Sequence, residues 1–209
     1  MANYQKYPRP SVDALFRHFE RKSKNYSNTD IQPEKTSLNY NLGPMRSLTQ
    51  KQYFNERLAN VFCLNRKDVK VLNTWLVTVP KDLDEKYHQS FFEETYDFLE
   101  NKYGRENVIS AWVHMDETTP HLHFAFIPVV YDTKKGREKV SAKECVTVAD
   151  LKKFHTELEN YLKSKGIEAN ILNGATVGGN RTVKELKAER EYTRKNPFGY
   201  NFEEKEIIF

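Results

Sequence analysis

The chain has 209 residues, of which 38% are hydrophobic and 30% charged, so it can form one substantial domain, or two small ones, with a highly charged surface. No run approaches the ~20 apolar residues that a membrane helix needs, and the charged, proline-containing N-terminus is unlike a secretory signal. Two distant cysteines, Cys63 and Cys145, argue against a disulfide framework or a CxxC zinc site and favour a reducing cytoplasm.

Positive charge is concentrated at the N-terminus. Residues 1–24 hold six basic and two acidic side chains, a net charge of +4, so residues 25–209 balance to zero. A basic arm on a neutral body suits a polyanion such as nucleic acid. A solubilising tail is the alternative, and charge alone does not separate the two.

The first half of the chain contains two predicted helices and one predicted strand. Residues 1–10 are polar with two prolines and predict an extended basic arm, which a helix over Ser11–Lys24 follows. Asn25–Pro44 is irregular and ends in a short strand-like piece. A second helix is expected over Thr49–Cys63, and the β-branched run Val69–Pro80 predicts a strand.

The second half begins with a long amphipathic helix over Asp84–Tyr103, followed by a histidine-rich hairpin. Lys134–Lys143 reads as a charged loop, and a helix over Val148–Lys165 starts from a capping box. Residues 182–209 predict a charged helix and tail. This order of elements indicates an α+β fold in which helices pack on a largely antiparallel sheet, with residues 1–209 as a single domain.

The hairpin lies within Val113–Val129, VHMDETTPHLHFAFIPV. Apolar and polar residues alternate on both sides of the Asp-Glu-Thr-Thr-Pro segment, which is the pattern of two strands joined by a turn. Side chains two apart share a face of a strand, so His121 and His123 point the same way, and His114 is expected to face them across the ladder.

Three imidazoles on one sheet face indicate a metal site with positions left for water or substrate. The set suits zinc, manganese, nickel or iron. The alternative is that each histidine is an ordinary strand residue with its own hydrogen bond. Asp116 is predicted to orient a ligand histidine by a hydrogen bond without binding the metal itself, and Glu117 to act as a base or hydrogen-bond partner. The alternative for both acids is that they only stabilise the turn or are solvated.

Three motifs resemble those of the MobV-type (Pre/Mob) plasmid mobilisation relaxases, a family of HUH endonucleases. HMDETTPHLH matches H-x-D-E-x-x-P-H-x-H, His18–Arg21 resembles H-N-x-R, and Asn39–Leu42 resembles N-Y-E/D-L. Two positions depart from the family pattern, since Phe19 stands where the family has Asn and Asn41 where it has an acid.

The resemblance implies a bacterial cytoplasmic enzyme with an HUH relaxase-like fold that nicks and rejoins one DNA strand at a plasmid transfer origin. It implies a covalent 5′-phosphate link to His18, with Arg21 on phosphate charge and Glu117 orienting or activating the nucleophile. His114, His121 and His123 would hold a divalent metal, Mn²⁺ first and Mg²⁺, Zn²⁺ or Ni²⁺ as alternatives.

The expected partner is single-stranded or hairpin DNA of the origin. A homodimer through a C-terminal region beyond this chain is a further expectation. The residues predicted to contact DNA are Tyr4, Arg17, Lys22, Asn39 and Tyr40.

Three other interpretations remain open. The nucleophile could be a tyrosine, Tyr26 or Tyr40, as in most HUH enzymes. The chain could instead be a non-catalytic module that binds a DNA hairpin and uses metal for structure, or a metal-dependent hydrolase of small substrates.

Overall fold

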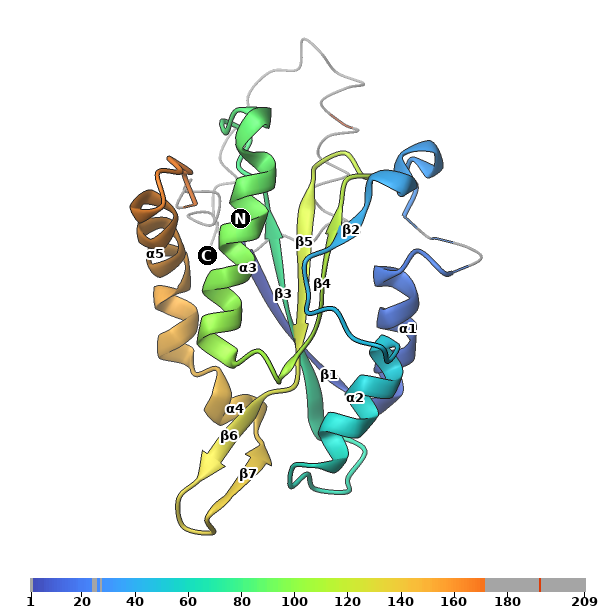
Figure 1. Ribbon diagram of the computed structural model, residues 1–209, viewed down its shortest axis with the longest axis vertical. Helices are drawn as coiled ribbons and strands as arrows, with labels where there is room; N and C mark the ends of the chain where they lie inside the picture. Colours follow the sequence, from blue (N-terminus) through green and yellow to red (C-terminus); the bar gives the residue numbers. More distant parts are fainter. Residues whose placement is uncertain (1, 24–25, 27, 172–191, 193–209) are drawn as a thin grey trace, which may run out of the picture. The chain divides into compact units, whose positions relative to one another are not determined.

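The computed structural model describes residues 2–23, 26, 28–171 and 192 (Figure 1). Contacts divide the chain into two compact units, 1–173 and 174–209. The prediction for residues 182–209 therefore lies outside the described residues, apart from Tyr192. The single-domain prediction stays a prediction.

A five-stranded antiparallel sheet in the order β1-β3-β5-β4-β2 forms the centre of the first unit. Its strands are β1 (Ala2–Pro8), β2 (Tyr40–Asn41), β3 (Lys70–Thr78), β4 (Val108–His114) and β5 (His121–Phe126). The strand predicted over Val69–Pro80 is confirmed as β3, and the hairpin is confirmed as β4 and β5. The α+β class with an antiparallel sheet is likewise confirmed.

Helices cover both faces of the sheet (Figure 1). One face is covered by α3 (His88–Tyr103) and α5 (Val148–Ser164), and the other by α1 (Arg9–Phe19) and α2 (Gln50–Ala59). Short 3-10 turns lie at η1 (Pro33–Leu38) and η2 (Glu85–Tyr87), and α4 spans Ala142–Cys145. The predicted capping box is present, since Thr147 Oγ1 accepts from Asp150 N and the Asp150 carboxylate accepts from Thr147 N.

The predicted extended arm is not free. Ala2–Pro8 pairs with β3 as an edge strand, and Tyr4 packs on Trp75 with ring centroids 5.0 Å apart. The following helix begins at Arg9, two residues before the predicted start at Ser11. Pro10 is tolerated in the first turn because its missing N–H would have no partner within the helix there. It also ends earlier than predicted, at Phe19.

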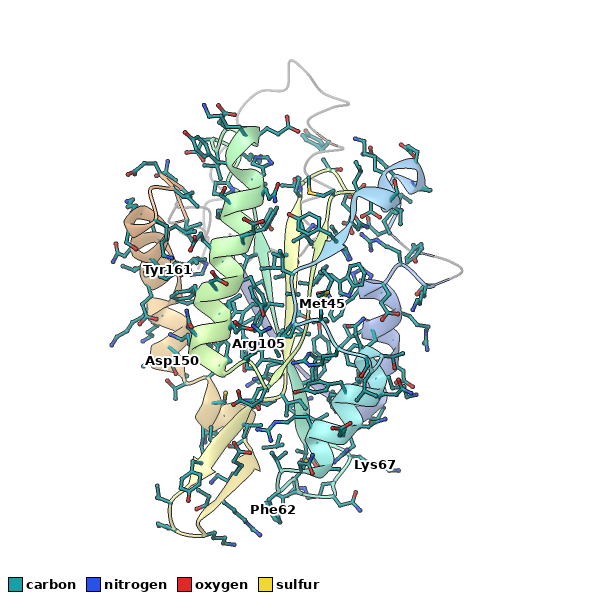
Figure 2. The ribbon with its side chains drawn as sticks, in the orientation of Figure 1. Met45, Phe62, Lys67, Arg105, Asp150 and Tyr161 are labelled. Carbon is teal, nitrogen blue, oxygen red and sulfur yellow. The ribbon has the colours of Figure 1, made fainter. Side chains whose placement is uncertain are left out.

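The predicted loop over Lys134–Lys143 was wrong in part. Arg137–Val140 forms β7, which pairs with β6 (Val129–Asp132) in a separate two-stranded ribbon. Phe62 lies at the same end of the unit (Figure 2), where its N–H donates to Glu138 O at 3.1 Å. The ribbon was missed because backbone pairing to a distant loop, not local apolar alternation, holds it.

Among the helices that the structure describes, none is long and apolar enough to cross a membrane.

Candidate active site

The β4–β5 register brings the three hairpin histidines together. His114 lies opposite His121, and Trp112 lies opposite His123, so all four side chains share one sheet face. Ring centroids are 5.3 Å apart for His114 and His121, 4.7 Å for His114 and His123, and 4.8 Å for His121 and His123. The predicted convergence of the three imidazoles is confirmed.

A fourth imidazole reaches the cluster from the end of α1. The His18 ring centroid lies 5.2 Å from that of His123 and 5.5 Å from that of His114. Val12, Phe16 and Phe19 are buried on one stripe of the helix, and this packing holds His18, at the edge of the stripe, above the strand histidines.

Backbone carbonyls fix the tautomers of two hairpin rings. His114 Nε2 lies 2.9 Å from Phe19 O, and His121 Nδ1 lies 3.0 Å from Thr119 O. A carbonyl oxygen only accepts, so these nitrogens carry the protons in the neutral rings. His114 Nδ1 and His121 Nε2 therefore keep their lone pairs. Among the described residues, buried His114 Nδ1 has no hydrogen-bond partner.

Burial favours the uncharged form of His18, His114 and His123. Burial lowers the pKa of His114 to about 3, although the Phe19 carbonyl opposes this shift. Burial, followed by the neighbouring histidines, lowers the pKa of His123 well below its ordinary value. Burial and then the charge of Arg21 lower the pKa of His18. Neutral imidazoles are what both metal binding and nucleophilic attack require.

The donor set fits a transition metal. His121 Nε2 and His123 Nε2 lie 3.0 Å apart, and two overlapping groups offer ligand atoms within 4.8 Å of one another. One group is His18, His114 and His123, and the other is His114, Glu117 and His121. His114 belongs to both groups, but neither group contains all three hairpin histidines. The metal set of His114, His121 and His123 therefore stays a prediction.

Arg21 turns the chain back toward the hairpin. It has a left-handed backbone, with φ of 54°, which costs a residue with a side chain on the order of 1 kcal/mol. Its Nε and Nη2 donate to Asp116 at 2.9 and 2.7 Å, and Nη2 also donates to Glu117 at 2.6 Å. This buried ion-pair network holds Arg21 in the strained conformation.

Asp116 contacts Arg21, where a contact with a ligand histidine was predicted. The carboxylate is fully buried and also accepts from Thr36 Oγ1 at 2.9 Å. Burial raises its pKa, but hydrogen bonds from Arg21 and Thr36 outweigh burial and lower the pKa to about 2. The prediction failed because the chain leaves the strand after His114, so Asp116 no longer follows the strand alternation.

Glu117 lies between the ion-pair network and the histidines. One carboxylate oxygen accepts from Asn28 Nδ2 at 2.8 Å, and the other lies 2.6 Å from Arg21 Nη2 and 3.9 Å from His121 Nε2. Glu117 thus connects the arginine to the imidazole cluster.

The predicted DNA contacts have diverse environments. The Tyr4 ring is not available to stack on a DNA base, because it packs against the core. Its hydroxyl accepts a hydrogen bond from Asn73 Nδ2 at 2.5 Å. Tyr40 pairs with Val113 and so projects from the sheet face opposite the histidines. Asn39 Oδ1 accepts from Met115 N at 2.7 Å. Arg17 and Lys22 are exposed near the end of α1, beside a hollow of about 250 Å³.

Sequence reasoning missed three contributors: Thr36, Asn28 and the Phe19 carbonyl. A backbone carbonyl leaves no trace in residue identity, and Thr36 and Asn28 lie in a segment without periodicity. Their position between two motifs was the one available signal.

Three imidazoles on an antiparallel sheet and a fourth from α1 lie next to an acid-bound arginine, in an HUH relaxase-like α+β fold. The family model described as "Plasmid recombination enzyme" matches residues 1–193, and the chain belongs to this family.

Curated relatives are similar over most of this chain. A plasmid recombination enzyme of Lactiplantibacillus plantarum is 34% identical over 93% of this chain and 55% of its own length. A type 1 enzyme of Staphylococcus aureus is 33% identical over 90% of this chain and 46% of its own length. The chain thus spans about half the length of these relatives.

Solved structures agree with the fold. The MobM relaxase domain, described as Mn-bound and bound to plasmid pMV158 oriT DNA, superposes with a TM-score of 0.73 at 32% identity. The match covers 90% of this chain and 97% of that one. The conjugative relaxase TrwC, at 12% identity and a TM-score of 0.51, shares the fold alone.

Proposed function

We propose that this chain is a metal-dependent relaxase that nicks and rejoins one strand at a plasmid transfer origin. The observation that carries the proposal is the placement of His18, from the first helix, against the three hairpin histidines. MobM, a relaxase domain bound to manganese and to origin DNA, supports the substrate class.

His18 is the proposed nucleophile. The lone pair of a neutral ring nitrogen attacks the phosphorus, a P–N bond forms, and the bond from phosphorus to the 3′ oxygen breaks. The leaving oxygen takes the electron pair and gains one proton, which matches the proton that the ring loses. The 5′ end remains on His18, and attack by a 3′ hydroxyl reverses the step and rejoins the strand.

A divalent ion held by His114, His121 and His123, Mn²⁺ by analogy with MobM, would polarise the phosphate and offset developing charge. The other roles fall to side chains. Burial keeps the His18 ring neutral and nucleophilic. Arg21 places a guanidinium beside the cluster, where it is paired with Asp116 and Glu117. Glu117 lies 3.9 Å from His121 Nε2 and is positioned to take a proton.

Tyr26 is the second candidate for the nucleophile. Its ring lies 5.8 Å from Arg21 Cζ, and its hydroxyl accepts from Ser23 N at 3.1 Å. Tyr40 is disfavoured because it projects from the opposite sheet face.

The adduct decides between the two candidates. The chain is incubated with Mn²⁺ and a library of candidate origins in supercoiled plasmid, and covalent products are treated with mild acid. We expect an acid-labile adduct that His18→Ala removes and Tyr26→Phe retains. An acid-stable adduct that only Tyr26→Phe removes would overturn the choice of His18.

The same incubation tests the other function classes. Saturating DNA binding without relaxation of any plasmid would favour a hairpin-binding module. A small-substrate hydrolase predicts no DNA affinity, whereas the relaxase predicts affinity that falls steeply with salt. Dimerisation and a bacterial cytoplasmic location are also proposals. Light scattering of the chain in solution checks the first.

A further inference from the structure

Four hydrogen bonds tie the segment Asn28–Asn39 to the turn after β4. Gln32 N donates to Asp116 O at 2.8 Å, and Met115 N donates to Asn39 Oδ1 at 2.7 Å. Thr36 Oγ1 donates to the Asp116 carboxylate and Asn28 Nδ2 to the Glu117 carboxylate. The segment contributes no histidine, yet it contacts both acids of the site.

Charge explains why these neutral donors are needed. Arg21 carries one positive charge and binds two carboxylates, so the group has an excess negative charge. The exposed fraction of the side chain is 4% for Arg21, 0% for Asp116 and 15% for Glu117. Water therefore does little to stabilise that excess, and hydrogen-bond donors from protein must do so.

The two acids use the donors differently. Thr36 and Arg21 Nε share one oxygen of Asp116, while Arg21 Nη2 takes the other. Both Asp116 oxygens are thus fixed, and with them the plane of the guanidinium that also contacts Glu117. Removing the Thr36 donor would free the carboxylate to rotate and would carry Arg21 with it.

We propose that Thr36 is a positioning residue, which sets the orientation of Arg21 through Asp116 and so the geometry of the nicking site. The consequence for catalysis rests on the proposed function. The positioning itself does not, because the orientation of Arg21 can be measured without DNA.

The test compares Thr36→Val, which keeps the shape and loses the donor, with Thr36→Ser, which keeps the hydroxyl. Thr95→Val is the matched control. Thr95 is buried on α3 under the other sheet face, and its Oγ1 has no hydrogen-bond partner among the described residues. All three variants and the parent chain are first compared by urea unfolding.

The first readout is the Nε–H resonance of Arg21 in ¹⁵N NMR, without DNA or metal. In the parent chain, Thr36→Ser and Thr95→Val, we expect a slowly exchanging signal, because the proton is bonded to Asp116. Thr36→Val should exchange faster by about tenfold or more. Unchanged exchange in Thr36→Val would overturn the proposal, whatever the DNA experiments give.

The second readout is the single-turnover nicking rate at saturating DNA, on whichever library origin the parent chain cleaves. Thr36→Val should be slower by about tenfold with DNA affinity nearly unchanged, and Thr36→Ser should recover the rate. Equal losses in the Val and Ser variants, or a loss in Thr95→Val, would contradict the role of the hydroxyl. Failure of the parent chain to nick any origin counts against the proposed function, and the NMR result still decides the positioning.

Discussion

The two faces of the central sheet have different compositions although they share the same strands. Under α3 and α5, the face is largely apolar and rich in aromatic rings: Trp75 stacks on Phe154 at 3.6 Å and Tyr103 on Phe126 at 4.0 Å. Under α1 and α2, β5 places Ala125 in an apolar core but His121 and His123 in the polar cluster.

Along β5, residues that stabilise the fold therefore point to one face of the sheet, and residues of the candidate site point to the other. One face excludes water over its whole length, which anchors the register that a site on the other face requires. A slip of one residue in β5 would exchange the histidines for Leu122 and Phe124. Packing on the α3/α5 face therefore fixes the strand register, and with it the position of the imidazoles, although it does not contact them.

The largest expected effect comes from deleting an aromatic ring on each face. Phe154→Ala and Phe54→Ala each remove a buried ring, from the α3/α5 face and from the α1/α2 face respectively. Each should lower the free energy of unfolding by about 3–5 kcal/mol, as measured in urea.

Only Phe54→Ala should slow nicking per folded molecule, because Phe54 packs against Phe16 in the helix that carries His18. If Phe154→Ala slows it equally, the two faces are not separable.

A smaller effect is expected from metal. Mn²⁺ at a concentration of a hundred times its dissociation constant should raise the free energy of unfolding by about 2.7 kcal/mol, since binding favours the folded state. His123→Ala should abolish the gain, whereas His155→Ala, on α5, should leave it intact. A gain that survives His123→Ala would place the ion elsewhere.

The smallest effect concerns the cap of α5 on the aromatic side. Thr147→Ala removes the oxygen that accepts from Asp150 N and should cost about 1 kcal/mol in urea unfolding. Mn²⁺ binding should be unchanged. Altered metal affinity in this variant would show that the stability of α5 affects the metal site on the opposite face of the sheet.

Local patterns predicted the parts of the fold that depend on neighbours in sequence. The alternation around Pro120 predicted the hairpin and its converging histidines, and the Thr147–Asp150 spacing predicted the start of α5. Non-local pairing defeated the prediction elsewhere. The partner of Ala2–Pro8 is β3, roughly seventy residues away, and nothing in a polar, proline-containing stretch announces it.

The site was predicted in its residues better than in its contacts. The motifs identified His18, Arg21 and the hairpin histidines, and the structure brings them together. The partner of Asp116 was wrong because the direction of a side chain after a strand ends depends on backbone angles that residue types do not determine. Thr36 was missed because its segment has no periodicity from which a side-chain direction could be predicted.

The bond from His114 Nε2 to the Phe19 carbonyl has a consequence for mutational tolerance. Its acceptor belongs to the main chain, so no replacement of the Phe19 side chain deletes it as long as the end of α1 stays in place. A phenylalanine can thus occupy a position where related motifs have an asparagine, because the main chain at the end of α1 sets the orientation of the His114 imidazole. Position 19 can therefore accept other side chains that keep the buried packing of α1, whereas its backbone must stay in place.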